Sequence, residues 1–229
     1  MHRLYLHIQA PFAAFRGMQA GVYRSTMPII PPSAAYGLVL NLAGIESRGE
    51  DDGTTTQMRA DLPPLRLAVG QVRDSSVSTL YQQLHSYPVG NSGKEFQQRT
   101  HGAKYWIAPV RREVLVGLDV VIGVESADAE LLAAVRSGLR GELDRPRYGL
   151  PFAGDNNFLF DRIDALTVAP PARWFTPLTD DSPRASSVRL TVAIDRADAS
   201  RTRTALLAPD GQATSTPPDA AWLWVPEAA

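Results

Sequence analysis

Cationic and aromatic side chains alternate in residues 94–112, which makes this segment the best suited of the chain to hold an anion. Five cations face one carboxylate there, so the local net charge is +4 in a chain whose formal net charge is −1. Cationic groups neutralise phosphates and aromatic rings stack on nucleobases. The candidate binding residues here are Arg99, His101, Lys104, Trp106 and Arg111. A solvated hairpin with scattered aromatic residues is the alternative, and for Trp106 the alternative is a place in the core.

A second cationic segment lies near the N-terminus. The first 45 residues contain no Asp or Glu, and the predicted loop at 10–30 carries Arg16, Tyr23 and Arg24. Because no carboxylate of the same segment neutralises these arginines, the loop is suited to a polyanion such as RNA. We expect Arg16 and Arg24 to contact phosphate groups.

A third candidate follows the predicted helix at 129–140. Residues 145–154 are punctuated by proline and glycine, and they carry Arg147, Tyr148 and Gly149. Backbone approaches a phosphate closely at glycine, while arginine and tyrosine clamp and stack. The alternative is an ordinary helix end and turn. We expect this loop to lie near the basic N-terminal loop.

No pattern in the chain is typical of a catalytic or metal site. The four histidines include no pair at the i, i+4 spacing of a helical metal site, and cysteine is absent. A phosphate-binding loop, a dinucleotide fingerprint and a nucleophile elbow are also missing. The acidic pairs Asp51–Asp52 and Asp180–Asp181 are typical of solvated surface turns. We therefore predict no catalytic residue, no metal and no cofactor.

Length and composition indicate one folded domain that covers residues 1–229. Hydrophobic residues make up 44% of the chain and charged residues 21%, values that are ordinary for a globular protein. No apolar run approaches the roughly 20 residues of a membrane helix, and no secretory signal opens the chain. We expect a cytoplasmic protein without a membrane partner.

Hydrophobic periodicity predicts two helices among several strands. The predicted elements are, in order, a strand at 3–9, a helix at about 33–44, strands at 65–73 and 114–124, a helix at 129–140, and strands at 158–168, 187–194 and 221–225. Asp128 is suited to cap the second helix, and Gly44 to end the first. Residues 74–105 show weak periodicity, which is typical of a functional arm or a poorly ordered loop.

This order predicts an α+β fold with a ferredoxin-like, RRM-type split βαβ core. An arm, or thumb, is inserted at 75–110, and a C-terminal strand extension covers 169–229. RRM domains present aromatic side chains to RNA on an open sheet face. His7 alternates with apolar residues of the first strand, so it is a candidate for such a face. Leu115, Leu118 and Val121 are expected in the core.

The sequence resembles, at three places, the RAMP-superfamily Cas subunit numbered five. The first strand runs into Ala10–Arg16, which is similar to the opening segment of that family. Residues 31–45 resemble its proline-entry helix with a Leu-Gly-Ile-like end, seen here as Leu42-Ala-Gly-Ile45. Residues 145–154 resemble its Pro-x-(Tyr)-x-x-Tyr-Leu-Gly-Arg loop. Here Gly154 is followed by Asp155, where the family commonly keeps an arginine. This difference argues against the contact with the RNA handle that the arginine would make.

The resemblance implies a non-catalytic subunit of a type I CRISPR surveillance complex, Cascade. Such a subunit grips the 5′ handle of the CRISPR RNA and caps the backbone filament in antiviral defence. Its partners would be the CRISPR RNA, the filament subunits and the large subunit, with target DNA recognised through guide pairing. Arg16, Tyr23, Arg24 and the other candidate residues above would then contact RNA.

Two alternatives stay open. In the type I-C branch of the family the subunit is a metal-independent endoribonuclease that processes repeat RNA with a Tyr and a Lys–His pair. The corresponding residues here would be Tyr36, Lys104 and His101, and general acid–base cleavage requires them to converge on one 2′-hydroxyl. A ferredoxin-like module that binds a protein or a small anion is the second alternative.

Overall fold

The structure is a computed structural model of the whole chain. It describes residues 1–17, 23–49, 57–88, 105–179, 184–195 and 198–226. The side chains of residues 84–88 and 105–108 are outside this description, although the backbone there is assigned to strands. Asp51–Asp52 and Asp180–Asp181 also fall outside it, so the prediction that they lie on solvated turns stays a prediction.

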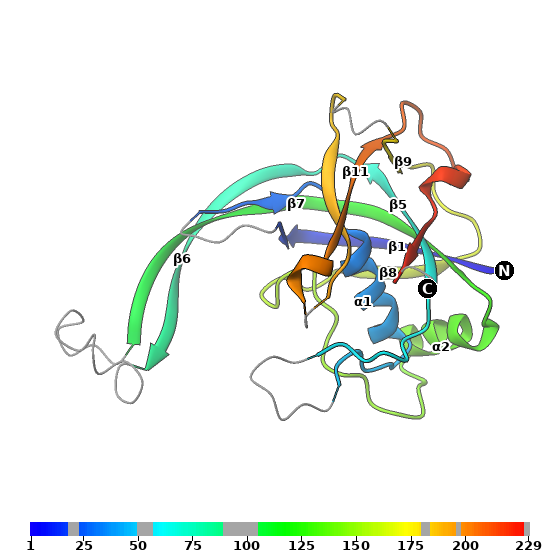
Figure 1. The fold of residues 1–229 in the computed structure, drawn as a ribbon, viewed down its shortest axis with the longest axis horizontal. Coiled ribbons are helices and arrows are strands. Elements are labelled where there is room, and N and C mark those ends of the chain that lie inside the picture. The colour runs from blue at the N-terminus through cyan, green and yellow to red at the C-terminus, as the bar shows by residue number, and fades with distance from the viewer. Residues whose placement is uncertain (18–22, 50–56, 89–104, 180–183, 196–197, 227–229) are drawn as a thin grey trace.

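Within the described residues, one large and mainly antiparallel sheet organises the molecule (Figure 1). Its strand order is β10-β11-β9-β5-β7-β1-β8. These strands are β1 (His2–Ala13), β5 (Leu65–Arg73), β7 (Tyr105–Ser126), β8 (Arg162–Leu166), β9 (Arg173–Pro177), β10 (Val188–Ala193) and β11 (Arg203–Pro209). Three more strands attach to it: β3 (Tyr23–Arg24) and β6 (Ser76–Pro88) pair with β7, and β12 (Leu223–Val225) pairs with β5. Strands β2 (Phe15–Arg16) and β4 (Thr26–Met27) form a separate pair.

Helices α1 (Pro32–Leu42) and α2 (Ala129–Arg140) cover one face of this sheet. Leu4, Leu6 and Ile8 of β1 alternate toward them and are fully buried. Asp128 caps α2 as predicted, because its carboxylate accepts the backbone N–H groups of Glu130 and Leu131. After α1, Gly44 adopts a positive φ of 71°, which favours glycine at a helix exit.

The opposite face of the sheet is covered over much of its area by the C-terminal part of the chain. Trp174 of β9 and Trp222 form a second core with Tyr5 and Val121. Gly123 has no room for a side chain, because a Cβ atom there would lie 2.7 Å from the Trp222 ring. The expectation of an open, aromatic sheet face is therefore corrected, since the two tryptophans on it are buried.

A long hairpin of β6 and the first part of β7 forms an arm that curves away from the body of the molecule (Figure 1). At the root of the arm, Gly117 has a φ of 73° and lies between the β7 residues that pair with Ala10 and Phe12. The buried side of β7 changes there, from Leu118 on the body side to Leu115 on the arm side. Gly117 therefore lets β7 turn out of the main sheet, because glycine adopts a positive φ without a steric penalty.

Two short 3-10 helices complete the chain, η2 (Ala199–Arg201) and η3 (Asp219–Ala221). The α+β class, both helices and the strand at 65–73 are confirmed, and Leu115, Leu118 and Val121 are buried as predicted. The predicted loop at 10–30 and the Pro-rich connection at 169–186 are wrong in part, since β1 runs on to Ala13 and β9 lies inside the connection. Strands β6 and β11 were not predicted. Pairing with other strands stabilises them, β6 with β7 and β11 with β10 and β9, and no alternating pattern of their own marks them.

Candidate nucleic-acid interface

The structure brings two of the three predicted cationic segments together. Strand β3 runs parallel to the arm part of β7, with Tyr23 beside Arg111 and Arg24 beside Arg112. The pairing therefore brings arginines of the N-terminal loop and of the arm together, with Tyr23 and Arg111 on one face of the two strands and Arg24 on the other. We call Arg16, Arg24 and Arg111, with Tyr23, the arm-side cluster.

Glu113 of β7 fastens the N-terminal loop to the arm. Its carboxylate accepts the backbone N–H of Thr26 at 3.0 Å and the hydroxyl of Tyr23. The hydrogen bond to Glu113 holds the pKa of Tyr23 above its ordinary value, so the hydroxyl stays a donor. The Tyr23 ring is 46% exposed, and the Arg111 guanidinium lies 5.9 Å from its centre. Tyr23 thus presents an aromatic face beside a cation.

Arg16 and Arg24 have no carboxylate partner among the described residues. Arg16 is exposed, and Arg24 is of intermediate exposure. Burial, together with the charges of Arg16 and Arg112, lowers the pKa of Arg24, and Asp155 offsets only part of that effect. Gathered cations that repel one another form a site that an anion would stabilise.

Arg112 differs from its neighbours because it is neutralised inside the protein. It is 3% exposed, and its Nη2 lies 2.7 Å from Oδ2 of Asp155. Its Nη1 donates to Gln82 Oε1 of β6 at 3.2 Å. Burial raises the pKa of Asp155, but hydrogen bonds from Asn157 and the charge of Arg112 more than offset this, so the pKa lies below its ordinary value. Arg112 therefore joins the arm to the 152–158 loop.

The departure at Gly154-Asp155 has a structural reason. A Cβ atom at Gly154 would lie 2.4 Å from the backbone oxygen of Ala14, and Gly154 has a φ of 81°. Ala14 donates its backbone N–H to the oxygen of Ala153 at 2.9 Å. The loop is thus anchored to the end of β1, and Asp155 reaches Arg112 from there.

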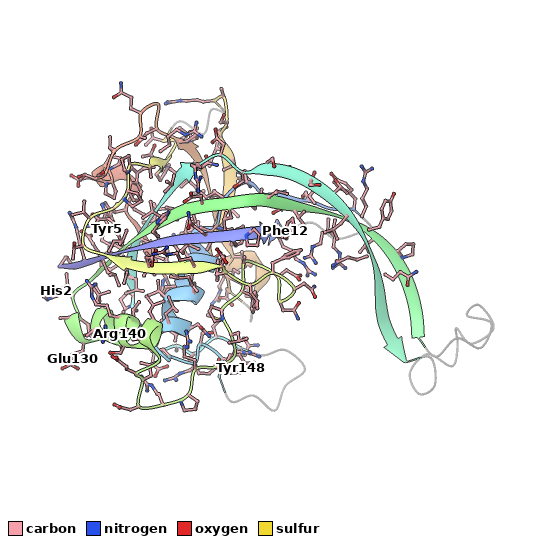
Figure 2. All side chains as sticks on the ribbon, turned by 180° about the vertical axis from the view of Figure 1, so that it is seen from behind. His2, Tyr5, Phe12, Glu130, Arg140 and Tyr148 are labelled. Carbon is pink, nitrogen blue, oxygen red and sulfur yellow. The ribbon has the colours of Figure 1, made fainter. Side chains whose placement is uncertain are left out.

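The third candidate segment lies elsewhere. Asn41 of α1 donates to the backbone oxygens of Tyr148 and Gly149, and the Arg48 guanidinium lies 3.8 Å from the centre of the Tyr148 ring. Figure 2 shows Tyr148 well apart from Phe12, and it is Phe12 that lies near the end of β1. Gly149 has a φ of 64° at an exposed turn, and Arg147 is of intermediate exposure. Of the described residues of this loop, those around Gly154 contact the 10–30 segment, at Ala14 and Phe15. The expected proximity to the basic N-terminal loop therefore holds for that end of the 145–154 loop.

Four further candidates cannot be placed. Arg99, His101 and Lys104 lie outside the described residues, as does the side chain of Trp106, whose backbone belongs to β7. Their roles in binding stay predictions.

Tyr36 lies in the core. It is 5% exposed and its hydroxyl donates to the backbone oxygen of Pro63 at 2.9 Å, while burial raises the pKa of the hydroxyl. Across the residues that the structure describes, no three His, Asp or Glu side chains group as a metal site. Over the same residues, no helix is long and apolar enough to cross a membrane.

Sequence reasoning missed the two residues that organise the interface, Glu113 and Asp155. Glu113 stands 87 positions from Thr26, which it holds, and no local pattern connects them. The only available signal was the contrast between an acid-free N-terminal segment and isolated carboxylates in later strands and loops.

Comparison with known proteins decides the family. The family model described as CRISPR-associated protein (Cas_Cas5) matches residues 3–140. The chain belongs to this family. The match covers β1 to α2, and thus the arm-side cluster, but it ends before the 145–149 loop.

Two solved structures share the fold. One, titled "CRISPR RNA-guided surveillance complex", has a TM-score of 0.56 at 12% identity, with 96% of each chain covered. The other, "Crystal structure of Cas protein", has a TM-score of 0.52 at 14% identity, and the match covers 93% of this chain and 96% of that one. A search of curated protein sequences finds no match. At such identities the likeness concerns the fold alone.

Proposed function

We propose that this CRISPR-associated protein is a non-catalytic subunit of a type I surveillance complex that binds the 5′ handle of the CRISPR RNA. The arm-side cluster carries the proposal, because Arg16 and Arg24 have no carboxylate partner among the described residues and because Tyr23, next to Arg24, exposes its ring beside Arg111. Phosphates would take the place of the missing carboxylates, and Tyr23 would stack on a base. The protein would cap the backbone filament, next to the large subunit, and guide pairing would recognise the target DNA.

The sheet supports a ferredoxin-like core within this proposal. Strands β5, β7, β1 and β8 are adjacent in that order, and all three pairings are antiparallel. Helix α1 connects β1 to β5 across β7, and α2 connects β7 to β8 across β1. This order and these connections support a split βαβ arrangement. We treat residues 75–110 as the inserted arm and 169–229 as the C-terminal extension of one domain.

The burial of Tyr36 supports a non-catalytic subunit over a ribonuclease. Its hydroxyl is held by Pro63 inside the core, where a 2′-hydroxyl or a scissile phosphate has no access. The tyrosine of a catalytic set near the first helix would have to be another residue.

Binding and cleavage are measured together on labelled repeat RNA, with and without its handle sequence, in EDTA. The expected result is handle-dependent retention of intact RNA. Arg24→Glu should weaken retention, whereas Arg140→Glu, a matched reversal at an exposed arginine of α2, should not. Cleavage in EDTA would replace the proposal with the ribonuclease alternative, and Lys104 and His101 would be removed first. Equal, negligible binding of all RNAs would indicate a module with another ligand.

A further inference from the structure

A groove of about 630 Å³ lies at the root of the arm. Arg73 and Asp74, at the turn from β5 to β6, border it on one side, and Gln9 and Asp161 border it on the other. Gly117 lies between them on β7 and has no side chain, and a Cβ atom there would meet nothing within 4 Å. The bottom of the groove is therefore backbone and small apolar side chains, and its rims are polar.

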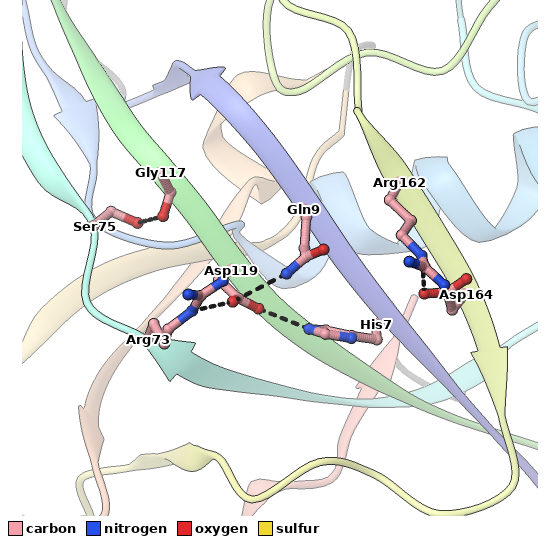
Figure 3. Close-up of polar contacts among 8 residues, drawn as sticks. All are labelled: His7, Gln9, Arg73, Ser75, Gly117, Asp119, Arg162 and Asp164. Carbon is pink, nitrogen blue, oxygen red and sulfur yellow. Dashed lines mark hydrogen bonds and ion pairs between the residues drawn. The ribbon is translucent and has the colours of Figure 1, made fainter.

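The hydrogen bonds of Asp119 fix the two donor side chains of this groove (Figure 3). Asp119 is 3% exposed and accepts Nε2 of Gln9 at 3.2 Å and Nε of Arg73 at 2.5 Å, while Nε2 of His7 lies 2.7 Å from its other oxygen. The outer nitrogens of Arg73 have no partner among the described residues, and the side chain is 73% exposed to solvent. Asp119 thus holds Arg73 with its donor end free.

The acceptor of the groove is Asp161. Its backbone N–H donates to the oxygen of Gln9 at 2.9 Å, which fixes its position, but none of the described residues pairs with its carboxylate. Asp74 differs, because Arg173 pairs with it. Among the described residues, the groove therefore holds one carboxylate and one guanidinium end without partners, on opposite sides of an apolar bottom.

The charges exclude a phosphate as the group recognised here. One arginine and two aspartates line the groove, so its lining has no excess of cations. A flat, uncharged ring with donors on one edge and acceptors on another fits this arrangement. Carboxylates accept the amino groups of bases, and arginine donates to ring nitrogens and carbonyls. The volume lies in the range of small-ligand sites.

We propose that the arm-root groove takes one unpaired nucleobase that carries an exocyclic amino group. The amino group of the base donates a hydrogen bond to the Asp161 carboxylate, and an acceptor on its ring accepts one from the Arg73 guanidinium. The face of the base lies on the Gly117 backbone. Gly117 follows Arg112 by five strand positions, a distance of roughly 17 Å along β7. One strand of RNA can therefore reach both sites. The inference rests on the proposed function, because the arm-side cluster supplies the phosphate contacts that bring the base within reach.

An abasic scan of the handle RNA tests the groove with the full-length protein. Each handle nucleotide is replaced in turn by an abasic one, and affinity is measured for the unmodified protein, for Asp161→Ala and for Asp144→Ala. Asp144 is exposed in another loop, so it is the matched control. Both Asp161 and Asp144 are exposed, so these variants are expected to fold normally.

At one position the abasic change should weaken binding to the unmodified protein and to Asp144→Ala by about 10-fold. Asp161→Ala should bind the intact RNA about 10-fold more weakly and lose its response at that same position alone. Ser76→Trp, which fills the groove from its rim, should behave like Asp161→Ala.

Three results would overturn the inference. Handle-dependent binding with a flat abasic scan would refute the base site and leave the proposed function intact. Groove variants that bind RNA normally but no longer assemble with partner subunits would show that a polypeptide occupies the groove. Absence of any RNA binding by the unmodified protein would refute both the groove and the proposed function.

Discussion

Two groups of arginines lie along β7, one beside Glu125 and one beside Arg111 and Arg112, and they differ in how their charges are paired. At the body end, Arg3 and Arg66 both donate to Glu125, which is 1% exposed, at 2.5 and 2.7 Å. Both guanidinium groups also lie over the Trp222 ring, at 5.2 and 5.9 Å from its centre. At the arm end, Arg16 and Arg24 have neither a carboxylate nor a stacking partner among the described residues.

Under the proposed function, the position of carboxylates, and not the number of arginines, would separate a structural cluster from a binding site. Glu125 satisfies its arginines within the fold, so that end of the sheet has no need of a ligand. Asp155 satisfies only the buried Arg112 at the other end. The remaining cations there are still to be neutralised, which is what a polyanion does.

The largest expected effect comes from the structural cluster. Trp222→Ala should destabilise the protein by about 3 kcal/mol, because a large buried ring is removed and a cavity forms over Gly123. Chemical denaturation measures this change, and RNA affinity should fall only as far as folding does. Trp224→Ala, a substitution at a partly exposed tryptophan of the neighbouring strand, is the matched control and should cost much less. Equal costs for the two would contradict the second core.

Glu125→Ala should have the next largest effect. It leaves Arg3 and Arg66 without their shared carboxylate, at a cost of about 2 kcal/mol, which is below the full value for a buried pair because both arginines retain access to water. The denaturation midpoint should fall, and it should fall by a similar amount in low and in high salt. A midpoint unchanged from the unmodified protein would show that the pair contributes nothing to stability.

The arm-side cluster should respond in the opposite way. Arg24→Leu should leave the free energy of unfolding within about 0.5 kcal/mol of the unmodified protein, since no internal partner is lost. It should weaken RNA binding and reduce the salt slope of that binding by about 1. Arg66→Leu should destabilise the fold and leave the salt slope unchanged. If Arg24→Leu instead destabilised the protein with a normal salt slope, the distinction between the clusters would be lost.

The smallest effect is expected at Asp119, midway between the two clusters. Burial raises the pKa of this carboxyl, but hydrogen bonds from His7, Arg73 and Gln9 more than offset this, so it lies below the ordinary value. The stabilisation is therefore present above the ordinary value of about 3.9 and is lost as the pH falls through the lower folded-state pKa. Asp119→Asn should flatten the acid limb of the stability curve, whereas Asp144→Asn should leave it unchanged.

The elements that sequence predicted well are those that local patterns determine. Helix α2 has its cap in Asp128 and its apolar stripe, and β5 has a bounded alternation. Strands β6, β9 and β11 follow no such pattern, because pairing with other strands stabilises them: β6 with β7, β9 with β5, and β11 with β10 and β9. Trp174 of β9 is fully buried although prolines surround its strand.

The same distinction applies to the candidate site. Arg16, Tyr23 and Arg24 stand out because their own segment lacks acids, which is a local property. Their fastening to the arm depends on Glu113, and the separation of the Tyr148 loop depends on Asn41. Both contacts join residues far apart in sequence, and they form only once the sheet and α1 are in place.

Strand β1 has a consequence for the order in which the chain is made. It precedes both of its neighbours by a long stretch of chain: its shortest pairing with β7, Ala13 with Leu115, spans 102 positions, and β8 follows later still. Leu4, Leu6 and Ile8 therefore belong to a strand whose two edges stay unpaired on the nascent chain until the arm has been translated. Nascent chains that stop before β7 should associate with chaperones or aggregate, and the body of the protein should fold only after the arm exists.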